Sequence, residues 1–246
     1  MTLFLEVEDD RGMASYNECG GMVLIRQGEE HLYEANLTAM SEVGVEYQLL
    51  NAKDLEELYP GISLKSYGPP RPIQDKEFGE PTGGAITSAL LVPASGYVSD
   101  PQLASHNLQI AAENRGAAFL FNRKVASIPT PHDCVSGVLL ETGETINSNF
   151  VINATGPHSG IVNEMAGVRD QLKITTKPLR HEVVYLPATA RHFENGGRFL
   201  VDTDTGVYQR PDGQDMLIGS ADPECDPHVI VDPDNYDSSF TEQWTL

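Results

Sequence analysis

Apolar positions along the chain fall into short runs separated by glycine, proline and aspartate, a pattern typical of an α/β protein with many turns. In the first part of the chain, apolar runs bounded by turns predict strands over 20–26 and 85–92. Helical spacing of apolar residues predicts helices over 34–43 and 51–60, which a glycine and a proline would end. Residues 61–82 are rich in proline, glycine and charge, so we expect them to form a loop.

The clearest helix start lies near the middle of the chain. Asp100 suits an N-cap and Pro101 the first helical position, where the missing N–H has no cost, and Gly116 would end the helix. Further on, Asp212-Gly213 predicts the turn of an antiparallel hairpin. The strands predicted after the helix are 117–121, 124–128, 135–141, 144–146, 150–154, 177–186, 198–203, 206–210 and 216–220.

The stretch 150–160 occupies a central place in this prediction. A buried strand over 150–154 would stop at Gly156, and a helix would follow from Ser159 to Met165. The small residues around this turn would let a flat cofactor approach the backbone, and the N–H groups of a helix start suit an anion. An ordinary strand–turn–helix of an α/β protein explains the same ten residues, so the segment alone does not decide between the two.

The length and the net charge of the chain limit the classes of protein to which it can belong. The 246 residues are enough for one large or two small domains with a real core. Acidic residues outnumber basic ones by 36 to 16, for a net charge of −20, which argues against a nucleic-acid partner because phosphate contacts need a basic surface. Two explanations of the acidity stay open: a strongly solvated surface, or adaptation to a high-salt cytoplasm.

The cysteines are few and far apart. Cys19, Cys134 and Cys225 form no CxxC pair and have no histidine at metal-ligand spacing, so we expect neither a disulfide scaffold nor a metal site. This usage agrees with a reducing, cytoplasmic location. No apolar run is long enough to cross a bilayer, and the first residues lack a signal-peptide pattern, so no membrane span is expected.

Several segments together resemble a known enzyme superfamily. The run 96–101 (GYVSDP) and its helix are similar to the G-x-V-D-P helix of FAD-dependent amine oxidoreductases in the D-amino-acid oxidase superfamily, which includes glycine, sarcosine and dimethylglycine oxidases. The succession of 122–125, a small meander and 151–157 (VINATGP) has the same order as in that superfamily. Three further segments resemble its other strands: 19–24, 180–183 and 208–211.

The resemblance implies a mixed α/β (α+β) fold, in which a partial FAD-binding Rossmann-like domain accompanies an antiparallel-sheet substrate domain. The domains would be 1–95, the first part of the substrate domain; 96–170, the partial FAD-binding domain; and 171–246, the second part of the substrate domain. The superfamily opens with a strand and a GxGxxG turn that hold the FAD pyrophosphate, and it closes with a glycine-containing segment under the flavin. The sequence has neither, so we expect an internal fragment that binds FAD weakly or not at all.

The resemblance also implies cofactor contacts. The backbone of Val125 would contact the adenine end of FAD, and Ala154, Thr155 and Gly156 would lie against its ribose and pyrophosphate. The ordinary structural explanation of Val125 is a valine of the core.

Three more residues resemble the substrate site. His181 and Tyr208 would be catalytic, facing the flavin and orienting the substrate amine or tuning its protonation. Arg210 would hold a substrate carboxylate, which a guanidinium binds in bidentate fashion. A core histidine, a cross-strand aromatic residue and a surface ion pair are the structural alternatives for these three.

The activity implied for the parent protein is FAD-dependent oxidation of the C–N bond of a small amino acid or N-methyl amino acid, with hydride passing to flavin N5 and the imine product hydrolysing in water. The substrate would be a small amine or amino acid, and the electron acceptor is left open between oxygen and a carrier. Two alternatives remain: a flavin oxidoreductase of the 2-hydroxy acid or glycerol-3-phosphate type, and a catalytically silent fragment or non-catalytic subunit that pairs with another chain.

Overall fold

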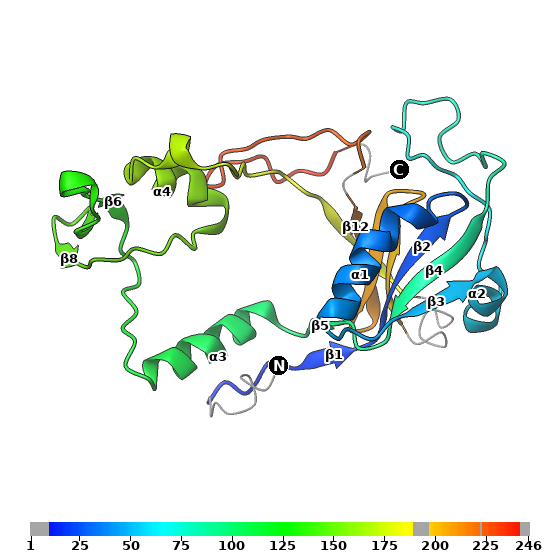
Figure 1. Cartoon of the computed structure of the whole chain (residues 1–246), viewed down its shortest axis with the longest axis horizontal. Helices are drawn as coiled ribbons and strands as arrows, with labels where there is room; N and C mark the ends of the chain where they lie inside the picture. The colour runs from blue at the N-terminus through cyan, green and yellow to red at the C-terminus, as the bar shows by residue number, and fades with distance from the viewer. Residues whose placement is uncertain (1–9, 189–196, 222, 242–246) are drawn as a thin grey trace. The chain divides into compact units, whose positions relative to one another are not determined.

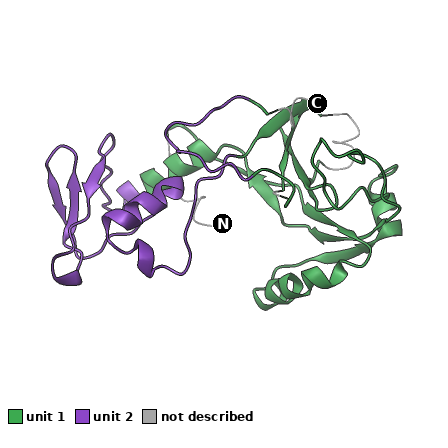
Figure 2. Ribbon diagram, turned by 90° about the horizontal axis from the view of Figure 1, so that it is seen from above, with its two compact units in different colours: residues 1–111, 181–227, 240–246 green, residues 112–180, 228–239 purple. Residues whose placement is uncertain are grey.

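A computed structural model describes residues 10–188, 197–221 and 223–241 of the chain (Figure 1). The chain divides into two compact units, which Figure 2 shows in different colours. Unit 1 comprises residues 1–111, 181–227 and 240–246, and unit 2 comprises 112–180 and 228–239. Each unit is therefore assembled from segments that are far apart in the sequence.

The compact units do not follow the predicted domains. The chain passes from unit 1 to unit 2 after Ala111 and returns after Arg180, whereas the predicted domains change at 95/96 and 170/171. The predicted domains are defined by what each part would bind, and a division by spatial contact does not test that. The three domain assignments therefore stay predictions.

A seven-stranded mixed sheet forms the centre of unit 1, in the order β3-β4-β2-β10-β11-β12-β9. β2 and β10 run parallel, and every other neighbouring pair in this sheet is antiparallel. The strands are β2 Gly21–Arg26, β3 Gln48–Asn51, β4 Ile86–Val92, β9 Val183–Pro187, β10 Phe199–Asp202, β11 Val207–Asp212 and β12 Asp215–Ser220.

The core of unit 1 lies between one face of this sheet and helix α2 (Ala52–Leu58). Leu55 of α2 is fully buried and packs with apolar residues of β2 and β4, among them Met22 and Leu91. The helix begins where predicted, because Asn51 and Asp54 form a capping box: the Asn51 side chain accepts from the Asp54 N–H, and the Asp54 carboxylate accepts from the Asn51 N–H.

Unit 1 also contains a 3-10 turn, helix α1, most of helix α3 and a two-stranded ribbon (Figure 1). A 3-10 turn, η2 (Glu30–Tyr33), leads into α1 (Glu34–Glu42), and β1 (Tyr16–Glu18) pairs antiparallel with β5 (Gly96–Val98). Helix α3 (Pro101–Glu113) follows β5, and the Asp100 carboxylate caps it by accepting from the Leu103 N–H at 2.9 Å. None of the helices in the described ranges is both long and apolar enough to span a bilayer.

Unit 2 contains a three-stranded antiparallel sheet and short helical segments. The sheet order is β6-β7-β8, and the elements are β6 Val125–Ser127, β7 Gly137–Leu140, β8 Thr145–Asn147, η3 Pro131–Asp133, η4 Gly156–His158, α4 Ser159–Met165 and η5 Arg169–Gln171. The predicted meander and the predicted helix 159–165 are thereby confirmed, as are the hairpin at Asp212-Gly213 and the mixed α/β class of the fold.

Two predicted strands of unit 2 are wrong. Residues 117–121 and 150–154 form no strand, and Phe150 and Ile152 expose 85% and 89% of their surface instead of being buried. A strand exists only where a neighbouring segment accepts and donates its backbone hydrogen bonds. In the described parts of the chain no segment pairs with either run, so both remain extended and exposed despite their apolar residues.

Candidate functional site

Tyr208 and Arg210 lie on one face of β11. They are two residues apart in the strand, so their side chains project to the same side. Tyr208 pairs with Gly219 of β12, and a Cβ placed on Gly219 would lie 2.5 Å from the Tyr208 hydroxyl oxygen and Cζ. The Tyr208 ring therefore lies directly over Gly219, and that position needs glycine for space.

Arg210 is held in place by neighbours in the same unit. Its Nη1 donates to the Pro211 carbonyl at 2.9 Å and to the Asp212 carboxylate at 3.1 Å. Its guanidinium carbon lies 4.7 Å from the ring centroid of Tyr97 in β5, a cation–π distance. Phe199 of β10 adds a second aromatic ring, with its centroid 6.0 Å from that of Tyr208. This face of the sheet thus combines a cation, a phenol and two further aromatic rings.

His181 lies two residues before β9, which β12 separates from β11. It is exposed and precedes by two residues Val183, which pairs with Gly219 of β12. Tyr208 covers that same glycine, so the two predicted catalytic residues sit on β11 and just before β9, with β12 between them. The structure thus brings together Tyr208 and Arg210, and His181 lies just before β9, two strands away from β11.

The predicted FAD contacts all lie in unit 2. Val125 is half-buried in β6, and Ala154, Thr155 and Gly156 are exposed at the turn before α4. Gly156 has φ +56°, which favours glycine, and an added Cβ there would meet nothing within 4 Å. The space beside Gly156 is therefore open for a ligand to approach the backbone.

Asn153 organises that turn, and sequence reasoning missed it. Its side-chain oxygen accepts from the Thr155 N–H at 3.2 Å and hydroxyl at 2.7 Å, and its amide nitrogen donates to the Ser159 carbonyl at 3.0 Å and the Asn163 side chain at 2.8 Å. Asparagine is a known turn residue because its side chain accepts from the backbone N–H two residues further on, and that signal would have found it. Because Thr155 donates its N–H internally, an anion here would have to bind other groups of the turn.

Helix α4 is short, and the anion contacts expected at its start stay a prediction. It has seven residues, a 3-10 turn precedes it, and its N-cap His158 makes no side-chain capping bond. The His158 ring instead contacts the Asp234 carboxylate at 3.0 Å. In the described ranges no three side chains of His, Cys, Asp or Glu gather as metal ligands would.

Comparison with known proteins identifies the family to which the chain is similar. Residues 1–244 match the family of FAD dependent oxidoreductases. Among solved structures, the chain is similar to L-proline dehydrogenase from P. horikoshii, with a TM-score of 0.63 and 22% identity, over 84% of this chain and 49% of that one. It is also similar to glycine oxidase from Bacillus cereus ATCC 14579, with a TM-score of 0.59 and 19% identity, over 95% of this chain and 55% of that one.

A third similar structure is L-amino acid deaminase from Proteus vulgaris, with a TM-score of 0.55 and 15% identity, over 83% of this chain and 42% of that one. The chain thus spans about half the length of the structures it matches. At these identities the structures show a shared fold, and the family match extends over nearly every residue. The resemblance noted in the sequence is confirmed: the chain belongs to the family of FAD dependent oxidoreductases, whose cofactor is FAD.

Proposed function

We propose that the protein oxidises the C–N bond of a small amino acid or N-methyl amino acid. The observation that carries this proposal is the pairing of Tyr208 and Arg210 on one sheet face in a member of an FAD dependent family. The structures that share its fold include a proline dehydrogenase, a glycine oxidase and an amino acid deaminase, which supports an amino acid as substrate.

The oxidation of a C–N bond requires groups that act on the substrate amine, and Tyr208 and His181 are the candidates. Hydride leaves the α-carbon only when the amine nitrogen is unprotonated, because its lone pair forms the new C=N bond. Tyr208, fixed over Gly219, and His181 would orient that amine or tune its protonation. FAD, when bound, supplies the acceptor for the electron pair, and water then hydrolyses the imine.

Arg210 would bind the substrate carboxylate. The two bonds to Pro211 and Asp212 both use Nη1, so a carboxylate would be bound by the edge that carries Nη2 and Nε. Stacking on Tyr97 fixes the plane of the guanidinium, which favours a single orientation of the bound substrate. For FAD itself we propose contacts from Val125, Ala154, Thr155 and Gly156, supported by the open backbone around Gly156.

The first test is a visible absorption spectrum of the 246-residue chain after incubation with FAD and removal of free cofactor. Retained flavin bands that glycine, sarcosine or proline bleach under anaerobic conditions would support the proposal. Tyr208→Phe and Arg210→Met should then slow the bleaching at least about tenfold, since each removes a group aimed at the substrate. Bleaching by 2-hydroxy acids or glycerol 3-phosphate, with none by amino acids, would overturn it.

A second candidate is a chain that is catalytically silent alone and functions with another polypeptide. Phe150 and Ile152 favour it, because apolar side chains exposed at 85% and 89% in a predicted strand are suited to a partner strand. A colourless chain after FAD incubation would support this candidate, and a stably coloured one would overturn it. Fast amide exchange over 117–121 and 150–154 is the matching prediction for the isolated chain.

We propose a cytoplasmic location on a separate observation. All three cysteines, Cys19, Cys134 and Cys225, lie in the described ranges, and each is a free thiol. Free thiols persist in a reducing compartment. Mass spectrometry of alkylated protein from intact cells should find the three thiols unoxidised, and a disulfide between any two would contradict this location.

A further inference from the structure

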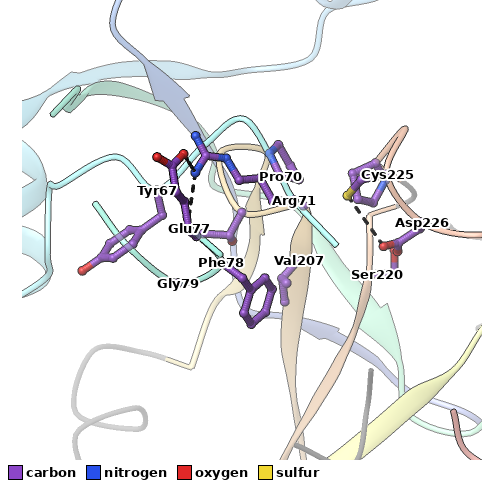
Figure 3. A pocket seen from close by; sticks show the side chains of 13 residues that line it. Tyr67, Pro70, Arg71, Glu77, Phe78, Gly79, Val207, Ser220, Cys225 and Asp226 are labelled. Carbon is purple, nitrogen blue, oxygen red and sulfur yellow. Dashed lines mark hydrogen bonds and ion pairs between the residues drawn. The ribbon is translucent and has the colours of Figure 1, made fainter. Parts of the chain in front are cut away.

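Unit 1 contains a second candidate site, a cavity of about 420 Å³ that the proposed function does not use (Figure 3). Its walls come from the loop 67–79, from the turn and strand at 205–207, and from residues 220, 223, 225 and 226. Ligand cavities of this size are lined mostly by apolar groups with a few polar ones, and here Phe78, Val207 and Pro223 provide apolar surface.

The cavity lies on the other side of the sheet from Tyr208. Val207 and Ser220 line it and pair with each other across β11 and β12. The next pair along the same strands is Tyr208 with Gly219, and successive residues of a strand project to opposite faces. A ligand in the cavity would therefore be separated from the Tyr208–Arg210 face by the sheet itself.

Buried hydrogen bonds hold the first wall in place. Asp204 is 2% exposed, and its carboxylate accepts from the Ser66 hydroxyl at 2.7 Å, the Tyr67 N–H at 2.6 Å and the Gly68 N–H at 3.0 Å. The start of the loop that carries Phe78 is thereby tied to the turn before β11. Such bonds pre-form a cavity, so a ligand need not order its walls on binding.

The opposite wall is fixed in the same way. The Ala221 N–H donates to the Gly206 carbonyl at 2.8 Å, and the Ser220 hydroxyl donates to the Asp226 carboxylate at 2.5 Å. A Cβ on Gly206 would lie 2.7 Å from Pro223, so the turn and this wall are in close contact. Both walls are therefore anchored by groups that the proposed oxidation does not involve.

The charges in the cavity favour a cation. Figure 3 shows Arg71 and Glu77, which form an ion pair with each other, on one wall and Cys225 with Asp226 on the other. Burial, with a smaller effect of Asp226, raises the pKa of the Cys225 thiol, which is therefore neutral at pH 7. The Arg71 charge is balanced by Glu77. The Asp226 carboxylate, which accepts from the Ser220 hydroxyl, adds a negative charge to the lining.

Two further features also favour a cation in this cavity. The Phe78 ring is 53% exposed, and the face of an aromatic ring attracts an organic cation. The net charge of −20 on the chain raises the local concentration of cations and repels anions. We propose that this cavity binds a small organic amine with an apolar body, its ammonium group directed at Asp226 and its body against Phe78 and Val207.

The test uses three probes of similar size on the full 246-residue chain: benzylamine, benzyl alcohol and benzoate. Isothermal titration should show benzylamine binding at least about fivefold tighter than benzyl alcohol, with no binding of benzoate. Higher salt should weaken only the benzylamine interaction, because screening acts on charge. Equal affinities for the amine and the alcohol, preference for benzoate, or no binding of benzylamine would each overturn the proposal.

Single substitutions test whether benzylamine binds next to Asp226. Asp226→Asn removes the charge but keeps an oxygen that can accept from Ser220, and it should weaken benzylamine binding about fivefold without changing benzyl alcohol binding. Asp215→Asn, an exposed carboxylate at the other end of β12, is the matched control and should change neither. Unchanged benzylamine affinity in Asp226→Asn would overturn the assignment.

Two further measurements test the proposal even if the Asp226→Asn variant fails to fold. Phe78→Leu keeps an apolar side chain at a half-exposed position and should lower benzylamine affinity about threefold through loss of the ring face. In a chain that carries Cys19→Ser and Cys134→Ser, benzylamine should slow alkylation of Cys225, and benzoate should not. Full-rate alkylation with benzylamine bound would place the ligand elsewhere and overturn the proposal. None of these readouts requires FAD, so they are independent of the proposed oxidation.

Discussion

The two compact units differ in how far their apolar residues are buried. Unit 1 contains ten of the twelve buried hydrophobic residues found in the described parts of the chain, and unit 2 contains only Ile128 and Leu140. In unit 1 every strand of the large sheet has a partner, whereas the two most apolar runs of unit 2 have none within the described ranges. An apolar run becomes a buried strand only when a partner covers it, so similar patterns lead to a core in one unit and to exposed surface in the other.

The largest expected contrast concerns two aliphatic residues, one from each unit. Leu55→Ala should lower the free energy of unfolding by about 2–5 kcal/mol, because Leu55 is fully buried and truncation leaves a cavity. Ile152→Ala should change it by less than about 0.5 kcal/mol, because that side chain is 89% exposed. Urea unfolding followed by circular dichroism measures both. A similar loss in the two variants would show that Ile152 is packed and would break the comparison.

Substitutions of two glycines, one in each unit, test the same difference in packing. Gly219→Ala should destabilise unit 1 by about 1–3 kcal/mol and displace the Tyr208 ring, because the new Cβ would lie 2.5 Å from it. Gly160→Ala in helix α4 of unit 2 should instead stabilise by about 0.5–1 kcal/mol, since its Cβ would meet only the Thr176 carbonyl at 3.6 Å. Thermal unfolding reports both signs, and stabilisation by Gly219→Ala would contradict the close contact with Tyr208.

Asn153 tests whether unit 2 depends on local hydrogen bonds where it lacks a core. Asn153→Ala should lower stability by about 1 kcal/mol, because it removes the bonds to Thr155, Ser159 and Asn163. Hydrogen exchange at the Thr155 amide should accelerate accordingly. Asn149→Ala, at an exposed position nearby in the sequence, is the control, and an equal effect there would refute the special role of Asn153.

The smallest expected effect is a pH dependence in unit 2. Bonds from the Ser239 N–H and hydroxyl, both at 2.9 Å, hold the pKa of Asp237 below its ordinary value. A lowered folded-state pKa stabilises the fold above the unfolded-state pKa, and that contribution is lost as the pH falls through the folded value. Ser239→Ala should raise the pKa of Asp237 in a carboxyl NMR titration while keeping the backbone bond. An unchanged titration would contradict a role for the hydroxyl.

The sequence by itself determined the features that depend on neighbours a few residues away. The capping box of Asn51 and Asp54, the Asp100 cap of α3 and the hairpin after β11 are all local hydrogen-bonding patterns. The placement of Tyr208 and Arg210 on one face follows from the two-residue period of a strand. The family resemblance also came from short runs read in order along the chain.

Tertiary structure alone decided the contacts between distant segments. It placed Tyr208 over Gly219, stacked Arg210 on Tyr97, and formed a cavity between the loop 67–79 and residues 220, 223, 225 and 226. Among the described residues it also left 150–154 without a partner strand, where the apolar pattern predicts a strand. The physical reason is that a capping bond is satisfied within one turn of chain, whereas a strand needs a second segment for its hydrogen bonds, and only the folded arrangement supplies or withholds that segment.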